Sequence, residues 1–313
     1  MPFFLYLKDM IEVKNVSYFY NHKTDDEIKA VSDVSFKIDE GEFVVILGHN
    51  GSGKSTLSRM LNALIFPHEG NILVDGFDTS NENKIYDVRT NVGMVFQNPD
   101  SQIVCSTVEE ELAFGPSNLG ISRDEIFKRI DFALKLTDLE DYRFTSPSRL
   151  SGGQKQKVAV ASVLTMKPKY IILDEPTSML DPYGREKILD TLRTLNKEEK
   201  ISIILVTQLM REAFEADRVL VMNKGNLVFD GKPQKLFSNR DKLKKYSLDV
   251  PTMGIIFDRL KKSGVKLSSE ISMTSESLAS EIVNLYKKKK WGEKNGSIYN
   301  KCYNGQRFKK RFW

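Results

Sequence analysis

Unbroken runs of apolar residues recur along the chain, separated by stretches with helical periodicity. An unbroken run predicts a strand that is covered on both faces, as in a parallel sheet. Since helical stretches lie between the runs, the predicted fold class is α/β with a parallel sheet core. The runs are FVVILG (43–48), VGMVF (92–96), YIILDE (170–175), SIILVT (202–207) and RVLVM (218–222).

Two other segments alternate between apolar and polar positions. IEVKNVSYFY (11–20) and AVSDVSFKI (30–38) have the period of two that is typical of strands with one exposed face, which predicts a smaller antiparallel edge sheet. The alternation starts only after Met10. Residues 1–10 are therefore predicted to be an N-terminal extension, with Met10 as an alternative start.

The segment 98–165 is mostly helical in character and interrupts the series of strands, so it is predicted to be a helical insert within a core domain of residues 11–235. Ser122 and Glu125 have the spacing of a capping box. Ile126, Ile130 and Leu134 follow on one helical face.

Residues 236–290 are predicted to form a small helical appendix, a candidate dimer contact. It contains two stretches with an apolar helical face, MGIIFDRLKKSG (253–264) and ESLASEIVNLYKKKK (276–290). The apolar face of the second passes through Leu278, Ile282 and Leu285. Residues 291–313 have no period and are predicted to be a disordered basic tail.

Composition narrows the class of protein. The chain has 313 residues, of which 40% are hydrophobic and 28% charged, as in a globular protein with a sizeable core. Its 2 cysteines lack metal-binding spacing and favour a reducing compartment, and its 3 histidines argue against a histidine-based metal site. No apolar run approaches the ~20 residues that span a bilayer.

The sequence GHNGSGKST (48–56) matches the P-loop pattern G-x-x-x-x-G-K-[ST] between a predicted strand and a helical stretch, the context that the pattern requires. Its glycines allow successive N–H groups to point at phosphate oxygens, and the helix dipole adds positive potential there. Lys54 is predicted to contact the β- and γ-phosphates, Thr56 the α-phosphate, and Ser55 a Mg²⁺ ion. The predicted nucleotide-binding residues of the loop are Gly48, His49, Asn50, Gly51, Ser52, Gly53, Lys54, Ser55 and Thr56.

Two acidic residues end the run YIILDE. Asp174 and Glu175 follow four apolar residues, which places them at the carboxyl end of a buried strand, where ligands bind in open α/β sheets. Such a pair can simply cap a following helix. Beside a P-loop, however, Asp174 is predicted to hold Mg²⁺ through water, and Glu175 to polarise the attacking water as a general base.

Gln97 and Tyr20 each have a functional interpretation and a simpler structural one. Gln97 follows the run VGMVF, where its amide is placed to reach both Mg²⁺ and the attacking water, but by itself a solvated loop residue is the simpler interpretation. Tyr20 is placed to stack on adenine, but by itself an edge-strand aromatic is the simpler interpretation.

A second glycine pair, in LSGGQ (150–154), gives the chain two anion sites of the kind found at helix starts. The P-loop, Gln97, LSGGQ, LDEP and the LD of SMLDP occur in the order and spacing of the ABC-transporter ATPases, which the chain resembles over residues 11–230. This resemblance implies ATP and Mg²⁺ as cofactors. It also implies that two chains pack head to tail, so that the signature residues Leu150, Ser151, Gly152, Gly153 and Gln154 act on the partner's ATP, with Asp181 at the dimer seam.

A narrower resemblance concerns residues 97–121 and 243–251, which are similar to the energy-coupling factor branch of that family. It implies a prokaryotic importer of vitamins or metal ions, with this chain on the cytoplasmic face of the membrane. The implied partners are a second, paralogous ATPase, an integral-membrane T component and, indirectly, a substrate-binding S component. Glu109, Glu110 and Glu111 are a candidate acidic patch for the T component, or a solvated helix face.

The alternative is an ABC-type ATPase that acts on nucleic acid or the ribosome. Those relatives carry two cassettes or long coiled coils, which this sequence lacks, so no nucleic-acid partner is expected. The basic tail is the feature that keeps this alternative open.

One position departs from the family pattern. The family places a histidine after the strand SIILVT to contact the γ-phosphate, and this chain has Gln208 there. A neutral amide can donate to phosphate but carries no charge, which predicts a loss of ~10²-fold in rate. The hypothesis is a heterodimer in which this chain's own site is slow and its LSGGQ completes a faster site on the partner.

Overall fold

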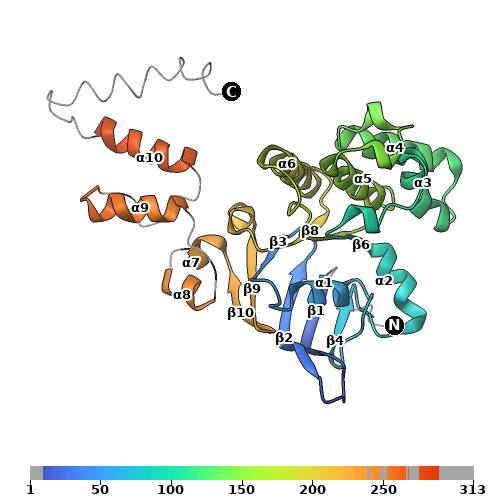
Figure 1. Cartoon of the computed structure of the whole chain (residues 1–313), viewed down its shortest axis with the longest axis horizontal. Coiled ribbons are helices and arrows are strands. Elements are labelled where there is room, and N and C mark those ends of the chain that lie inside the picture. Colours follow the sequence, from blue (N-terminus) through green and yellow to red (C-terminus); the bar gives the residue numbers. More distant parts are fainter. Residues whose placement is uncertain are drawn as a thin grey trace, which may run out of the picture. The chain divides into compact units, whose positions relative to one another are not determined.

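The computed structural model describes residues 10–237, 240–246, 248, 252–265, 267 and 275–288 (Figure 1). The chain divides into two compact units, with the division between residues 249 and 250. Helix α8 (Arg240–Lys245), predicted as part of the appendix, belongs to the first unit. Residues 1–9 of the predicted extension and the whole predicted basic tail lie outside the described residues.

A six-stranded sheet with the order β10-β9-β3-β8-β7-β6 forms the centre of the first unit. All neighbouring strands are parallel except β10, which pairs antiparallel with β9. The parallel sheet core predicted from the unbroken apolar runs is confirmed. Its strands are β3 (Phe43–Leu47), β6 (Val92–Val95), β7 (Tyr170–Asp174), β8 (Ser202–Thr207), β9 (Arg218–Asn223) and β10 (Asn226–Gly231).

The central strands explain why the runs are unbroken. Every residue of β3, β7 and β8 is buried, because both faces of these strands are covered. In the parallel register Leu47 pairs with Thr207, and Asp174 pairs with Val206. The segments that follow β3, β7 and β8 therefore leave the sheet at the same edge, which brings three distant parts of the sequence together.

A four-stranded antiparallel sheet has the order β2-β1-β4-β5, as the alternating segments predicted for its first two strands. The strands β4, β5 and β10 were not predicted from the sequence; β5 has only 2 residues, and all three lie at or near a sheet edge. The strands of this sheet are β1 (Met10–Tyr20), β2 (Ile28–Asp39), β4 (Glu69–Val74) and β5 (Phe77–Asp78).

The main core lies between the two sheets and around helix α1 (Lys54–Leu61). Leu57, Met60 and Leu61 of α1 are fully buried and belong to the same cluster as residues of both sheets. Burial of each such side chain contributes about 1.5–3 kcal/mol. The core thus fixes the body of the helix whose first residues belong to the predicted P-loop.

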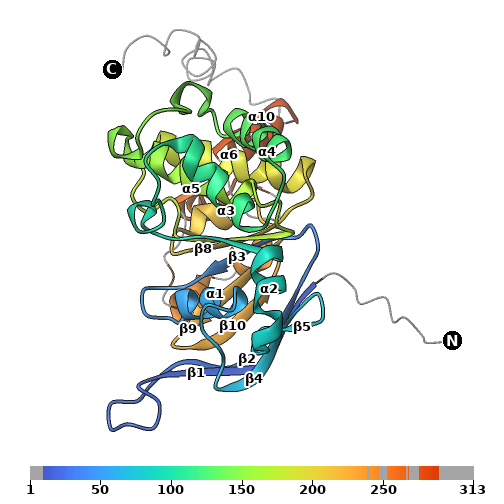
Figure 2. The same ribbon diagram turned by 90° about the vertical axis from the view of Figure 1, so that its right-hand side faces the viewer.

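Helices α3 (Val108–Asn118), α4 (Arg123–Leu136) and α5 (Gly152–Leu164) lie within the predicted helical insert. Figure 2 shows them on the side of the large sheet opposite α1 and the antiparallel sheet. Ile126, Ile130 and Leu134 of α4 are buried, as predicted from their spacing. The first unit also contains α2 (Ile85–Asn91), α6 (Pro182–Glu198), α7 (Pro233–Phe237) and short 3₁₀ turns, one of them η5 (Met210–Ala213).

Two predictions about the insert were wrong. Ser122 precedes α4 but makes no side-chain cap; Glu125 bonds instead to Lys167 and Arg129, and these partners lower its pKa to about 2. The cations outcompete the backbone amide for the carboxylate. The capping boxes are at Thr107 before α3 and Ser151 before α5.

The second wrong prediction concerns Glu111 at the start of α3, whereas its neighbour Glu110 is exposed and Glu109 is half-buried. Glu111 is buried and accepts from the backbone N–H groups of Val104 and Cys105, both at 2.9 Å. Glu110 completes the capping box, and Glu109 pairs with Arg143. Negative charge near a helix start is stabilising, so these side chains hold the insert's own loops.

The second unit contains α9 (Thr252–Lys262) and α10 (Ser275–Lys288), which correspond to the two predicted amphipathic helices. Phe257, Leu267 and Leu278 form its core, with Leu285 packed against them. Ile282, predicted on the same face, is 38% exposed. Within the described ranges, no helix combines the length and the apolar character that a membrane span needs.

Candidate nucleotide-binding and hydrolysis site

The loop between β3 and α1 depends on two of its glycines. A Cβ at Gly48 would lie 2.4 Å from the carbonyl oxygen of Met222, and a Cβ at Gly53 would lie 2.4 Å from that of Ala30. Gly53 also has a φ of 99°, in the left-handed region that favours glycine. The loop is therefore packed against backbone on two sides, and its shape does not tolerate side chains there.

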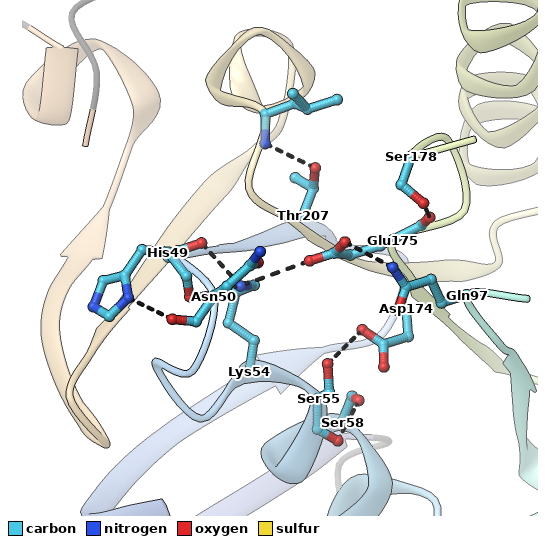
Figure 3. A network of polar contacts seen from close by, with 12 residues as sticks. His49, Asn50, Lys54, Ser55, Ser58, Gln97, Asp174, Glu175, Ser178 and Thr207 are labelled. Carbon is cyan, nitrogen blue, oxygen red and sulfur yellow. Dashed lines mark hydrogen bonds and ion pairs between the residues drawn. The ribbon is translucent and has the colours of Figure 1, made fainter. Parts of the chain in front are cut away.

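Lys54 is almost completely buried at the start of α1 (Figure 3). Its Nζ donates to the carbonyl oxygens of Gly48 (2.9 Å) and His49 (3.0 Å) and lies 3.8 Å from Oε1 of Glu175. Burial lowers the pKa of Lys54, and the nearby carboxylates of Glu175 and Asp174 oppose this change. The ammonium group is thus held inside the loop with its charge only partly balanced.

Two other loop residues have informative surroundings. Ser52 is fully buried, and its Oγ has no hydrogen-bond partner, although such groups are usually paired. His49 has Nδ1 2.7 Å from the carbonyl oxygen of Asn50 and Nε2 3.0 Å from Oδ1 of Asn223. The unpaired hydroxyl fits a loop shaped for a ligand rich in acceptor oxygens.

The carboxylates of Asp174 and Glu175 lie beside this loop (Figure 3). Ser55 Oγ donates to Oδ1 of Asp174 at 3.0 Å, and Gln97 Nε2 donates to Oε2 of Glu175 at 3.2 Å. Burial raises the pKa of both carboxyl groups. The structure therefore brings together five residues that the sequence predicted to act together, as two hydrogen-bonded pairs, Ser55–Asp174 and Gln97–Glu175, with Lys54 in ion-pair distance of Glu175.

The backbone of Glu175 is unusual. Its φ is 49°, a left-handed conformation that is uncommon for a residue with a side chain and that recurs at functional sites. Its N–H donates to the carbonyl oxygen of Val206 at 2.8 Å, and its carbonyl accepts from Ser178 Oγ at 2.9 Å. These bonds offset the strain and aim the carboxylate toward Lys54.

Tyr20 and Gln208 lie at the periphery of the cluster. The Tyr20 hydroxyl is 3.0 Å from Thr56 Oγ1, and its ring, 38% exposed, packs edge-on against Tyr18. Gln208 follows the end of β8, next to β7 and β3, but its side chain is exposed and does not join the cluster. The turn after β8 is held by Thr207 Oγ1, which accepts from the Leu209 N–H at 3.0 Å.

The predicted signature residues have a different environment. Ser151 and Gly152 are exposed at the start of α5, while Leu150 is buried beneath them. Ser151 and Gln154 form a capping box with each other, with bonds of 2.8 and 3.3 Å. A Cβ at Gly152 would meet nothing within 4 Å, and one at Gly153 would make only an ordinary contact with Leu180. The chain itself gives no reason for two glycines here.

Asp181, the predicted seam residue, is the N-cap of α6 and accepts from the Gly184 N–H at 2.9 Å. Close by, the structure shows three residues that the sequence analysis missed: Thr177, Arg185 and Glu212, a buried polar cluster behind the Glu175 loop. No motif or spacing pointed to them, because Glu212 comes from a segment far along the chain.

The class of protein follows from this fold and cluster together with the comparisons. Residues 31–178 match the family model described as ABC transporter. The chain belongs to this family of ATPases.

Within the family, the chain is similar to the energy-coupling factor transporter ATP-binding proteins. It is 51% identical over 269 residues to the protein named EcfA1 of Clostridium novyi (strain NT), which covers 86% of this chain and 96% of that protein. It is 48% identical over 280 residues to EcfA1 of Clostridioides difficile (strain 630), over 89% of this chain and 100% of that protein. The chain therefore belongs to the energy-coupling factor branch.

Solved structures agree. The structure of cbiO1 from Clostridium perfringens, described as part of the ABC transporter complex cbiONQ, is 36% identical, with a TM-score of 0.69 over 80% of this chain and 99% of that one. The dimeric structure of MJ0796, a bacterial ABC transporter cassette, is 33% identical, with a TM-score of 0.65 over 71% of this chain and 98% of that one.

Proposed function

We propose that this chain is the ATP-hydrolysing subunit of an energy-coupling factor transporter and powers import through a membrane component. The observation that supports this most strongly is the cluster of hydrogen-bonded and ion-paired side chains beside the loop between β3 and α1. The residues from Gly48 to Thr56 would hold the phosphates of ATP, and Tyr20 would stack on its adenine ring.

The residues of the cluster fit a magnesium ion. Mg²⁺ prefers oxygen ligands, takes few of them from the protein, and keeps waters and substrate phosphates for the rest. The Ser55 hydroxyl and the Asp174 carboxylate are oxygen donors 3.0 Å apart, with the Gln97 amide at Glu175 beside them. No cluster of three or more His, Cys, Asp or Glu side chains suited to a metal occurs among the described residues. The ion would neutralise charge on the phosphates.

In hydrolysis, Glu175 accepts a proton from the attacking water, and Gln97 orients that water and the Glu175 carboxylate. Burial raises the pKa of Glu175, which makes the carboxylate a stronger base at neutral pH, while Lys54 keeps it ionised. When ATP binds, Nζ of Lys54 would exchange its carbonyl partners for phosphate oxygens. Their negative charge stabilises the buried ammonium group more strongly than the carbonyl groups do.

The exposed signature supports a dimer in which each ATP lies between two chains. Ser151, Gly152 and Gly153 present N–H groups at a helix start with open space before them. A P-loop covers only one side of a triphosphate, so the second anion site is useful on the other side, where only another chain can place it. Asp181 would lie at this seam. MJ0796, a family member, is described as dimeric in a state bound to ADP and Pi.

The partners follow from the branch. We propose a paralogous ATPase as the second subunit, an integral-membrane T component as the direct contact, and an exchangeable S component that binds a vitamin or metal ion. The cbiO1 structure is described as part of the complex cbiONQ, which supports an assembly with other subunits. This chain would work at the cytoplasmic face of a bacterial membrane.

Gln208 supports an asymmetric pair. Its amide follows β8 at the edge where β3 and β7 end, at the place for a γ-phosphate contact, but it carries no charge. We propose that this chain's own P-loop site is the slower one, and that its LSGGQ completes a faster site on a partner with the histidine.

The test is affinity purification of the tagged full chain from detergent-solubilised membranes of its own organism. The expected result is co-purification of a second ATPase and a small integral-membrane protein, with ATPase activity that Glu175→Gln reduces. Recovery of nucleic acid or ribosomal proteins in their place would overturn the transport function and favour the alternative ABC-type ATPase.

A further inference from the structure

The buried polar cluster behind the Glu175 loop joins three segments that are far apart in the sequence. Thr177 lies two residues after Glu175, Arg185 lies in the first turns of α6, just after Asp181, and Glu212 lies in η5, four residues after Gln208. All three flank the place proposed for the γ-phosphate or the dimer seam.

Glu212 is the centre of this cluster. Its side chain has no exposed surface, Oε1 accepts a hydrogen bond from Thr177 Oγ1, and Oε2 has no hydrogen-bond partner. Thr177 is itself fully buried. A buried carboxylate oxygen without a hydrogen-bond partner is energetically costly and calls for a physical reason.

Arg185 supplies an incomplete counter-charge. Its Nε lies 3.9 Å from Oε1 of Glu212, beyond hydrogen-bond distance, and is also buried without a partner. Its NH2 group donates to the carbonyl oxygen of Leu180 at 3.3 Å, one residue before Asp181. A small movement of the Asp181 segment would therefore bring Nε of Arg185 within hydrogen-bond distance of the Glu212 carboxylate and give this unpaired nitrogen a partner.

From these contacts we infer that Glu212 is a positioning residue for hydrolysis, which couples the Asp181 loop and the Gln208 loop to the Glu175 loop. Through Thr177 it fixes the segment that aims Glu175. Through Arg185 it senses the position of the Asp181 loop, so that docking of a partner chain at the seam tightens the cluster. This inference rests on the proposed function of the site but concerns residues outside it.

The test uses variants of the full chain that separate the bond from the charge. Thr177→Val removes the hydroxyl and keeps the shape, Thr177→Ser keeps the hydroxyl, and Glu212→Gln keeps the bond and removes the charge. Glu215→Gln is the control, since Glu215 lies in the same segment but pairs with Arg193 at the surface.

Hydrogen–deuterium exchange on the nucleotide-free chain reports the coupling without any need for turnover. We expect Thr177→Val to increase exchange both in residues 175–184 and in residues 207–213, with Thr177→Ser and Glu215→Gln like the wild type. An increase confined to residues 175–184 would overturn the coupling.

Turnover of the full chain in its ATP-dependent dimer provides the second measurement. For Glu212→Gln we expect a kcat about tenfold lower and a KM for ATP within about twofold of the wild type, with Thr177→Ser near the wild type in both. An unchanged kcat would contradict the positioning role. Wild-type turnover in Glu175→Gln would instead refute the proposed site, and the exchange result would remain interpretable on its own.

Discussion

The P-loop region and the LSGGQ region are both built to hold phosphate, but the chain completes only the first. Lys54 and Asp174 are buried and bonded to residues of the loop and helix that follow β3, and Gly48 is packed so tightly that one methyl group would collide with backbone. Ser151 and Gly152 are exposed, and the only side-chain partner of Ser151 among the described residues is Gln154 in its own helix cap. The buried P-loop site is therefore completed by residues of this chain, whereas the exposed LSGGQ site needs contacts from another surface.

The largest expected effect comes from the buried region alone. Glu175→Gln removes the general base while its amide still packs in the same space, so turnover at this chain's own P-loop site should fall by about 10²–10⁴-fold. ATP binding should persist, since the phosphate-holding loop is untouched. Phosphate release and titration with a fluorescent ATP analogue measure the two quantities. If binding is lost together with turnover, Glu175 has a structural role in place of a catalytic one.

A pair of glycine substitutions tests the comparison directly. Gly48→Ala places a Cβ 2.4 Å from the Met222 carbonyl oxygen, so both the melting temperature and ATP binding should fall. Gly152→Asp places its Cβ in open space at a helix start, where a negative charge is favourable, so the melting temperature should hold. Its turnover should nevertheless fall by about a hundredfold, because the carboxylate repels the partner's ATP.

Calorimetry, nucleotide titration and phosphate release on the same two preparations distinguish the outcomes. Full turnover in Gly152→Asp would contradict the phosphate-holding role of the LSGGQ region, because the new carboxylate would then not face the partner's ATP. The comparison also breaks if Gly48→Ala is as stable as the wild type.

Gln208→His sharpens the comparison because it tests which of the two nucleotide sites in the pair hydrolyses ATP. In a reconstituted pair, a charged imidazole beside the γ-phosphate should raise turnover at this chain's own site by about ten- to a hundredfold. If the partner's site already dominates, total turnover changes little, whereas substitution of the partner's histidine abolishes it. The asymmetry is refuted if that partner substitution is harmless while Glu175→Gln in this chain stops hydrolysis.

The smallest expected effect concerns stability. Burial raises the pKa of Asp174 above its value in the unfolded chain, so the unfolded state loses this proton first as the pH rises. The free energy of unfolding therefore falls across that window and stays reduced at neutral pH. Asp174→Asn should raise the nucleotide-free melting temperature at pH 7 by on the order of 2 °C, and this gain should shrink as the pH approaches 4.

Differential scanning calorimetry at several pH values measures this change. Asp190→Asn is the matched control, because Asp190 is an exposed residue of α6 that pairs with Arg193. An equal gain in both variants, or a gain that does not depend on pH, would exclude burial of Asp174 as the cause.

Much of the buried region could be predicted from the sequence, because motif and strand coincide there. FVVIL runs straight into GHNGSGKST, and YIIL runs into Asp174, so pattern and chemistry place the same residues at one sheet edge. β4 and β10 were missed, since each has too few apolar residues to stand out as a strand. The roles of individual site residues stay predictions.

Individual side-chain contacts, local or distant, left no trace in the sequence. Glu111 was predicted at a surface and is buried, since two backbone N–H groups of the preceding loop bind its carboxylate. Nothing in the spacing of Thr177 and Glu212 indicates that they touch. Such contacts depend on where loops return after long connections, which local periodicity does not encode.

Because of the position of helix α1, nucleotide binding is expected to stabilise the folded state of the first unit. Its first residues belong to the P-loop, and its next two turns are packed into the core between both sheets. A ligand held at its start stabilises only the folded chain, by about 2.7 kcal/mol at a hundred times its dissociation constant. In a cell with little ATP, the protein would therefore unfold more often and be degraded faster. The amount of transporter would then fall together with the ATP concentration.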